Sequence, residues 1–218
     1  MTQITPELLL KAYAFGVFPM AKSRDEEEVY WVQPKERGVI PLDKFHIPKS
    51  LRKLLRKEVF EIRTDSAFTE VMLGCAESGP GREDTWINEQ IIDLFSSLFD
   101  AGLAHSVEAW IDDQLVGGLY GLAMGSVFFG ESMFTRHDNA SKVTLCHLIA
   151  ILKKGGYRLL DTQFITDHLT QFGAVEMPHK DYMQELGDAL SHLGRFGPPL
   201  PYSDIERLLF SQSSTQTS

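Results

Sequence analysis

The stretch SVEAWIDDQLVGGLYGLAMGSVFFGESMF, residues 106–134, decides the fold. Residues 106–111, 115–124 and 126–134 are rich in β-branched, aromatic and alternating apolar residues, which favour extended strands. The run Asp112-Asp113-Gln114 reads as a turn between the first two strands. The stretch therefore predicts a three-stranded meander.

A helix and two further extended segments follow the meander. Ser141 is expected to open an amphipathic helix that ends at Gly155-Gly156. Residues 157–164 then predict a strand, residues up to Gly173 a short helix, and residues 174–177 an extended segment. The order β-β-β-α-β-α-β resembles the core of GNAT-type acyltransferases, which is a statement about fold rather than chemistry.

The segment before the meander predicts a small N-terminal α/β domain over residues 1–62, with a helix at 6–15 and short strands punctuated by Gly and Pro at 16–48. A helix near 67–75, a loop at the run SGPGRED, and a helix capped by Asn88 and ending at Gly102 lead into the meander. We expect an α+β chain in which a GNAT-like domain, a mixed sheet flanked by helices, occupies residues 63–201. Residues 202–218 form a C-terminal segment whose polar end, SQSSTQTS, is expected to be disordered.

Composition narrows the function classes. The 218 residues are 43% hydrophobic, carry a formal net charge of −9, and contain no apolar run long enough to cross a bilayer. The negative charge argues against nonspecific coating of nucleic acid. Cys75 and Cys146 are expected to be buried free thiols, and the N-terminus lacks the features of a secretory signal, so we expect a cytoplasmic protein. The histidines show no metal-ligand spacing, and we expect no metal and no cofactor.

One local patch is basic. Residues 44–57 contain six basic residues and no acidic one. Read as a helix capped by Ser50, the segment places Leu51, Leu54 and Leu55 on one face and its basic side chains, Arg52, Lys53, Arg56 and Lys57, on the other. A solvated amphipathic helix and a landing surface for RNA both explain this pattern.

Polar side chains interrupt two strands that otherwise read as buried. Glu131 lies within residues 128–134, and Asp161 and Gln163 share one face of the strand at 157–164 because they are two residues apart. A buried carboxylate requires a cation, a polar partner or water. These residues fit a polar site, but a structural network also explains them, with Asp161 capping the next helix or pairing with Lys142, and Glu131 pairing with Arg136.

The connection between the third strand and the next helix bears on the acyl donor. A GNAT enzyme that uses acetyl-CoA normally holds the pyrophosphate with a Gly-rich loop at this helix N-terminus. Here the connection, residues 135–141, reads TRHDNAS and contains no glycine. An acyl donor other than a CoA thioester is therefore favoured.

Several segments together resemble the leucyl/phenylalanyl-tRNA:protein transferase family. They run in order across nearly the whole chain: residues 12–19, 31–34, 46–50, 85–87, 105–110, 115–121, 130–134, 139–142, 160–163 and 167–174. The resemblance implies a small N-terminal domain followed by a GNAT-like domain. It also implies transfer of Leu or Phe, less often Met, from aminoacyl-tRNA to proteins beginning with Arg or Lys. We expect the protein to be a monomer.

The resemblance also implies roles for particular residues. Asp161 and Gln163 match an acidic/amide pair, for which we hypothesise proton relay and orientation of the acceptor amine, and Glu131 becomes a candidate for binding the cationic acceptor side chain. Trp86 matches a tryptophan near the aminoacyl-adenosine end of the donor, and Lys49, Arg52, Lys53, Arg56 and Lys57 become candidates for binding tRNA phosphates. The implied donor side-chain pocket consists of Met133, Leu148, Leu152 and Leu160.

Two departures from the family pattern affect substrate contacts. Met20 stands where many members have Trp, and Leu148 and Leu152 stand where some members carry Phe, so the sequence leaves the preference among Leu, Phe and Met open. Two other classes of function also remain open from the sequence: a CoA-dependent GNAT N-acyltransferase, and a noncatalytic module that binds tRNA or N-degrons.

Overall fold

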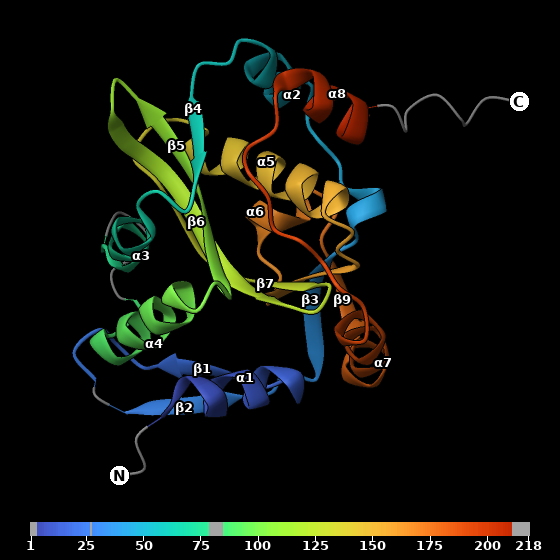
Figure 1. Cartoon of the computed structure of the whole chain (residues 1–218). Helices are drawn as coiled ribbons and strands as arrows, with labels where there is room; N and C mark the ends of the chain where they lie inside the picture. The colour runs from blue at the N-terminus through green and yellow to red at the C-terminus, as the bar shows by residue number, and fades with distance from the viewer. Residues whose placement is uncertain (1–3, 27, 79–84, 211–218) are drawn as a thin grey trace, which may run out of the picture.

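The computed structural model describes residues 4–26, 28–78 and 85–210. Two sheets organise this part of the chain (Figure 1). The smaller pairs β1 (Phe18–Ala21) with β2 (Val29–Val32), and the larger has seven strands in the order β4-β5-β6-β7-β8-β3-β9. The strands of the larger sheet are β3 (Glu36–Ile40), β4 (Glu61–Thr64), β5 (Ala104–Ile111), β6 (Gln114–Met124), β7 (Val127–Thr135), β8 (Leu159–Gln163) and β9 (Val175–Pro178).

Helices lie between and around these strands. They are α1 (Pro6–Ala14), α2 (Lys49–Arg56), α3 (Phe68–Ala76), α4 (Glu89–Asp100), α5 (Ala140–Lys154), the short α6 (Asp167–Thr170), α7 (His179–Leu190) and α8 (Tyr202–Phe210), with a 3₁₀ turn at Leu42–Lys44. The predicted fold class, a small N-terminal region and a mixed sheet flanked by helices, is confirmed. Among the described residues no helix is both long enough and apolar enough to cross a membrane.

The predicted meander is present, because β5, β6 and β7 pair as successive antiparallel neighbours. Alternating residues of these strands face two separate cores. Val107, Leu119 and Phe128 pack in the core that contains α2, α5 and α8. Tyr120 and Phe129 pack in the core that contains α1, α3, α4 and α7. The period-two pattern of the sequence therefore arises because both faces of this one sheet are buried, each against its own core.

The parallel contact between β7 and β8 is short, and this opens the sheet. It consists of the pairs Val127 with Leu159, Phe128 with Leu160 and Phe129 with Asp161. Both strands continue beyond these pairs, β7 to Thr135 and β8 to Gln163, without further pairing to each other. The split between the two strands leaves room for a pocket at the centre of the sheet.

The N-terminal segment contributes to both sheets. β3 pairs antiparallel with β8 on one side and with β9 on the other, so residues 36–40 are an interior strand of the large sheet. The predicted domain boundary at residue 62 stays a prediction. Such a boundary would assign β3, an interior strand of the large sheet, to the N-terminal domain.

Two helix starts and two helices differ from expectation. α2 begins at Lys49 after Pro48, so Ser50 lies inside the helix and is not its cap. α5 begins one residue early, after Asn139, which has a left-handed φ of 66° that Asn tolerates better than most residues. α7 and α8 have no counterpart among the helices that the sequence predicts. Residues 79–84, where the sequence predicts a loop, and residues 211–218, where it predicts disorder, lie outside the described part of the chain.

Candidate active site

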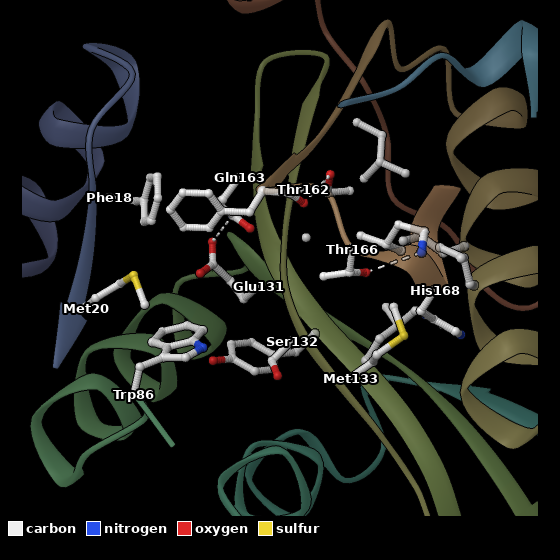
Figure 2. A pocket seen from close by; sticks show the side chains of 18 residues that line it. Phe18, Met20, Trp86, Glu131, Ser132, Met133, Thr162, Gln163, Thr166 and His168 are labelled. Atoms are coloured by element: carbon white, nitrogen blue, oxygen red, sulfur yellow. Dashed lines mark hydrogen bonds between the residues drawn. The ribbon is translucent and has the colours of Figure 1, made fainter. Parts of the chain in front are cut away.

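A pocket of about 290 Å³ lies where β7 and β8 separate. Figure 2 shows Phe18, Met20 and Trp86 at one end, and Met133, Thr166 and His168 at the other. The wall between them is mainly apolar and includes Leu119, Leu145, Leu148, Leu160 and Leu169. The polar side chains of Glu131 and Gln163 interrupt this wall on one side.

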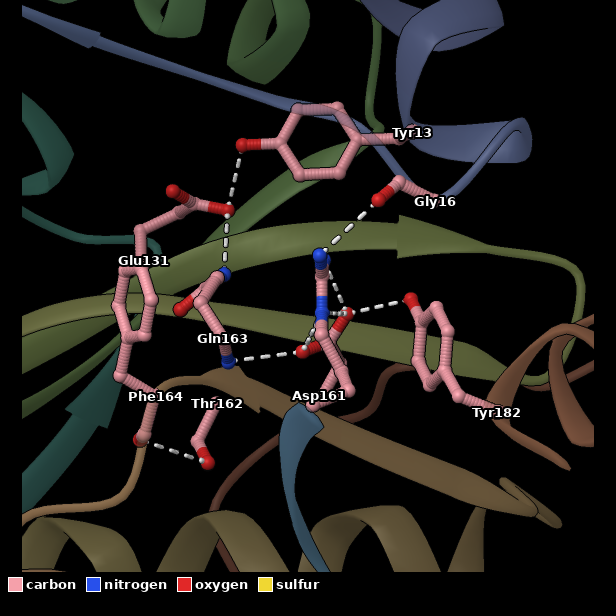
Figure 3. Close-up of polar contacts among 9 residues, drawn as sticks. Tyr13, Gly16, Glu131, Asp161, Thr162, Gln163, Phe164 and Tyr182 are labelled. Atoms are coloured by element: carbon pink, nitrogen blue, oxygen red, sulfur yellow. Dashed lines mark hydrogen bonds and ion pairs between the residues drawn. The ribbon is translucent and has the colours of Figure 1, made fainter. Parts of the chain in front are cut away.

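A buried ion pair stands behind this polar side (Figure 3). The Arg37 guanidinium donates through Nε and Nη2 to the Asp161 carboxylate, with a closest distance of 2.7 Å, and through Nη1 to the Gly16 carbonyl at 3.0 Å. Tyr182 donates its hydroxyl to Asp161 Oδ2 at 2.6 Å. Arg37 and Asp161 are both 0% exposed. Such a pair holds its geometry because each charge would be costly without the other.

Gln163 connects this ion pair to the pocket. Its backbone N–H donates to Asp161 Oδ1 at 2.8 Å, and its side-chain amide donates to Glu131 Oε1 at 3.3 Å. Gln163 has a left-handed φ of 58°, which turns the chain at the end of β8. The Asp161 carboxylate thus fixes an uncommon backbone conformation that aims the Gln163 side chain at Glu131.

Gly38 allows β3 to approach this turn. Gly38 pairs with Gln163, and a Cβ at Gly38 would lie 2.6 Å from the carbonyl carbon of Phe164. The close backbone approach therefore requires glycine at this position. This approach brings the neighbouring Arg37 side chain to Asp161.

The Glu131 carboxyl receives a second hydrogen bond from the N-terminal helix. Tyr13 of α1 donates its hydroxyl to Glu131 Oε1 at 2.7 Å. Burial, with a further contribution from the Asp161 charge, raises the pKa of Glu131 to about 8, although the Tyr13 hydrogen bond and Arg37 act in the opposite direction. The pocket therefore contains a carboxyl that titrates near neutral pH.

Of the eight sequence candidates outside residues 49–57, the structure brings six to this pocket. Trp86, Glu131, Met133, Leu148, Leu160 and Gln163 all line it. Asp161 does not line the pocket; it lies behind Gln163 and accepts a hydrogen bond from the Gln163 backbone N–H. Leu152 is also buried and does not line it, because it lies one helical turn beyond Leu148 on α5.

The structural pairings considered for the two carboxylates do not occur. Asp161 pairs with Arg37 rather than with Lys142, and Arg136 pairs with Glu77 at 2.5 Å rather than with Glu131. The pairing with Arg37 joins residues far apart in sequence, which local spacing does not reveal.

The basic residues of α2 lie apart from the pocket and divide into two groups. Arg52 donates to the Ile47 carbonyl and stacks on Phe210 of α8, while Arg56 contacts Tyr202 and Glu206 of α8. The exposed side chains of Lys49 and Lys53 in α2, and of Lys57 at its C-cap, make no hydrogen bond or ion pair with any residue that the structure describes. The lysines therefore remain available to an external anion.

Sequence reasoning missed three residues of the polar network, namely Tyr13, Arg37 and Tyr182. Arg37 left a signal, since it stands beside the apolar run Gly38-Val39-Ile40 and an unpaired charge there would be costly. Tyr13 and Tyr182 left none, because an aromatic residue on a helix ordinarily fills a core. Among the described residues, no group of three His, Cys, Asp or Glu side chains is placed to hold a metal ion.

A mixed sheet split by a pocket, with a carboxyl and an amide on one otherwise apolar wall, is an arrangement that suits an enzyme of the acyltransferase type. The model of the leucyl/phenylalanyl-tRNA protein transferase family matches residues 39–187, and the model of that family's N-terminal domain matches residues 2–35. The chain belongs to the leucyl/phenylalanyl-tRNA protein transferase family. It is an aminoacyltransferase, with an aminoacyl-tRNA as donor and a protein as acceptor.

Relatives with this name match almost end to end. The transferase of Rhodospirillum rubrum is 59% identical over 201 residues, which covers 92% of this chain and 94% of the relative. That of Paramagnetospirillum magneticum is 60% identical over 196 residues, covering 90% and 94%. That of Maricaulis maris is 54% identical over 212 residues, covering 97% of both chains.

Solved structures match more weakly. A conserved protein of unknown function from Staphylococcus epidermidis matches with a TM-score of 0.42 and 15% identity, over 81% of this chain and 66% of that one. The structure described as L-PGS from Bacillus licheniformis matches with a TM-score of 0.42 and 14% identity, over 94% and 63%. At these TM-scores the likeness supports no inference about this chain.

Proposed function

We propose that this protein acts in the cytoplasm as a monomer, where it transfers Leu or Phe, and less often Met, from aminoacyl-tRNA to proteins that begin with Arg or Lys and so marks them for degradation. The observation that carries the proposal is the pocket between β7 and β8, which combines an apolar wall with the Glu131–Gln163 corner. The wall suits an unbranched or γ-branched apolar side chain, and the corner suits a cationic amine. The reaction is aminolysis of an ester, which requires neither a metal nor a cofactor.

The donor side chain is proposed to enter the apolar wall. Met133, Leu148 and Leu160 contribute to this wall, as the sequence resemblance implies, and Leu145 and Leu169 extend it. Each buried CH₂ group of the donor contributes about 0.8 kcal/mol. A wall of this kind binds Leu, Phe and Met and offers no partner for a polar side chain, which supports selection among charged tRNAs by hydrophobicity.

Trp86 is proposed to contact the adenosine that carries the amino acid. It lies at the end of the pocket opposite His168 and is partly exposed (Figure 2). Stacking of a base on an aromatic side chain contributes about 1–3 kcal/mol. Met20, close by, replaces the tryptophan of many family members with a flexible apolar contact.

The acceptor is proposed to enter at the polar corner. Glu131 is the one carboxylate among the described residues that line this pocket, and Gln163 lies beside it. The ionised form of this carboxyl attracts the two positive charges of an N-terminal Arg or Lys. Asp161 is proposed to act through Gln163, whose position its carboxylate fixes.

Aminolysis requires that the acceptor amine be oriented as well as deprotonated. An α-amino group has a pKa near 8, so about a tenth of N-termini are neutral at pH 7. Holding a neutral amine against the ester carbonyl converts a bimolecular reaction into an effectively unimolecular one. Gln163 and Glu131 are placed to provide that orientation on one side of the pocket.

The body of the tRNA is proposed to contact α2. Lys49, Lys53 and Lys57 are spaced four residues apart and therefore share one exposed face of the helix. Arg52 and Arg56 are also candidates from the sequence, but their side chains already contact Ile47 and α8. The lysine face is thus the stronger candidate for phosphate binding, in a chain whose net charge is −9.

One assay separates this function from the other two classes. Purified protein is incubated with labelled Leu-tRNA or Phe-tRNA and a peptide beginning with Lys or Arg, with Asp- and Glu-initiated peptides as a comparison series. Label on the peptide supports transfer. Retention of tRNA without labelling indicates a binding module, and acetylation of the peptide from labelled acetyl-CoA without any use of tRNA indicates a CoA-dependent acyltransferase.

A further inference from the structure

In the proposed function two carboxyl groups, those of Asp161 and Glu131, lie near the reacting ester. They differ in whether an oxygen atom is free to accept a proton. Asp161 is fully buried, and both its oxygens are occupied. Oδ1 accepts from Arg37 Nε at 2.9 Å and from Gln163 N at 2.8 Å, while Oδ2 accepts from Arg37 Nη2 at 2.7 Å and Tyr182 at 2.6 Å. A proton received by Asp161 would have to displace one of these donors and break a buried ion pair.

Glu131 presents the opposite arrangement. Both its hydrogen bonds, from Tyr13 and Gln163, reach the same oxygen, Oε1. Oε2 has no hydrogen-bond partner among the described residues, and Figure 3 shows it pointing away from the Arg37–Asp161 cluster. Glu131 also lines the pocket, whereas Asp161 does not. A substrate amine can therefore reach Glu131 directly.

We propose that Glu131, through Oε2, takes the proton from the acceptor's α-ammonium group, and that Tyr13 of the N-terminal helix holds and tunes this carboxylate. The proposal rests on the aminoacyl transfer proposed above and identifies the proton acceptor of that reaction. Asp161 then serves as a positioning residue that acts through Gln163.

The proton and bond changes balance without a further reactant. Glu131 takes one proton from the ammonium group, which leaves a neutral amine. The amine nitrogen attacks the ester carbonyl and forms the C–N bond, and the ester C–O bond then breaks. The ribose oxygen leaves with a second proton from the nitrogen, and the proton on Glu131 is returned to water. The products are an amide, the tRNA with a free ribose hydroxyl, and one released proton.

The electrostatic surroundings of Glu131 fit this role. Burial raises the pKa of its carboxyl to about 8, close to that of an α-amino group. Proton transfer between groups of matched pKa near the working pH is the favourable case for general-base catalysis. The titratable and charged groups around it are Tyr13 on α1, Arg37 on β3 and Asp161 on β8, with Tyr120 on β6 and Tyr182 on α7 close to this cluster and His168 at the far end of the pocket.

A substitution at Tyr13 tests the proposal without changing Glu131. Its ring packs edge-on against Phe129, with centroids 4.8 Å apart, so Tyr13→Phe retains the packing and removes the hydroxyl. The Tyr13 hydrogen bond lowers the pKa of Glu131, so its loss raises that pKa. The acid limb of the rate profile, where Glu131 loses its proton, must therefore move to higher pH.

The experiment measures kcat/KM for an Arg-initiated peptide against pH, with saturating Leu-tRNA. The acceptor amine is identical in every reaction, so a shift between variants reports a group on the enzyme. We expect Tyr13→Phe to move the acid limb to higher pH while the plateau stays within a few fold. Tyr30→Phe, at an exposed tyrosine on β2, is the matched control and should leave the profile unchanged.

The second arm uses Glu131→Gln and Glu131→Asp, with folding checked by thermal unfolding. We expect Glu131→Gln to lose about 10²–10⁴ in rate for Arg- and Ala-initiated peptides alike, and Glu131→Asp to recover part of it. An unmoved profile in Tyr13→Phe, or a Glu131→Gln enzyme that keeps its rate, would overturn the proposal. Loss of Arg preference alone would assign Glu131 to the acceptor side chain instead. If the wild-type protein transfers no amino acid at all, the proposed function itself fails.

Discussion

Arg37 and Asp161 are 124 residues apart in the chain, and Arg37 Nη2 lies 2.7 Å from Asp161 Oδ2 in the interior of the protein. The guanidinium also lies over the rings of Phe18 and Tyr182, at 4.6 and 4.8 Å from their centroids. One ion pair thus joins the N-terminal segment, the central strands and α7. The geometry of Gln163 at the pocket depends on it.

Removing one member of this pair should destabilise the fold. Arg37→Met leaves the Asp161 carboxylate buried beside Tyr182 and Gln163 without a cation, which costs about 3–5 kcal/mol. Urea unfolding measures the change. Arg63→Met is the control, because Arg63 pairs with Glu61 and Asp113 at the surface, where water screens the charges, and its loss should cost much less. Equal losses for the two variants would show that the buried pair is not critical.

The two leucines of α5 should respond differently to truncation. Leu148 lines the pocket and Leu152 does not, although both are buried. Leu148→Ala is expected to change the ratio of kcat/KM for Leu-tRNA over Phe-tRNA. Leu152→Ala is expected to lower stability by about 2–5 kcal/mol and leave this ratio unchanged. A changed ratio in Leu152→Ala would extend the donor pocket along the helix, as the sequence resemblance implies.

The lysine face of α2 should determine how strongly tRNA binding depends on salt. Reversal at Lys53 and Lys57 to Glu is expected to weaken tRNA binding and to reduce the slope of log affinity against log salt by about one per lysine or more. The control reverses two other exposed lysines, Lys35, which precedes β3, and Lys180 of α7, with the same change in net charge. Identical slopes for the two double variants would leave α2 as a solvated surface.

Glu131 should make the protein less stable as pH rises. Its folded pKa of about 8 exceeds the ordinary value of 4.5, so the folded state holds an extra proton between these limits and stability falls across that window. Glu131→Gln cannot ionise. Its Tm relative to wild type should therefore rise between pH 4.5 and pH 8, by about 2–4 °C for each 1 kcal/mol. A constant difference across this range would mean that the Glu131 pKa is not raised.

Local pattern was sufficient for much of the fold. The meander at residues 106–134, the helix after it and the strand at 159–163 follow from period-two and helical spacing, because each buries a face of its own. The position of β3 does not follow from local pattern. Its five residues look like any short strand, and their place between β8 and β9 is decided by contacts with residues far along the chain.

The residues of the candidate site also divide into those that the local sequence pattern predicts and those that only the folded structure reveals. Glu131 and Gln163 were found because polar side chains interrupted apolar strands, and both line the pocket. The difference between Asp161 and Glu131 could not be found this way. It depends on which oxygens Arg37, Tyr182 and Tyr13 occupy, and these partners come from three other elements of the fold.

The most direct test of the account is a crystal structure with a hydrolysis-resistant donor, in which an amide replaces the ester of leucyl- or phenylalanyl-adenosine. We expect the amino-acid side chain to lie against Leu148 and Leu160, the adenine against Trp86, and the carbonyl carbon within reach of Gln163 and Glu131. A ligand bound elsewhere, or bound here with its carbonyl carbon remote from Glu131 and Gln163, would contradict the claim that aminoacyl transfer takes place between β7 and β8.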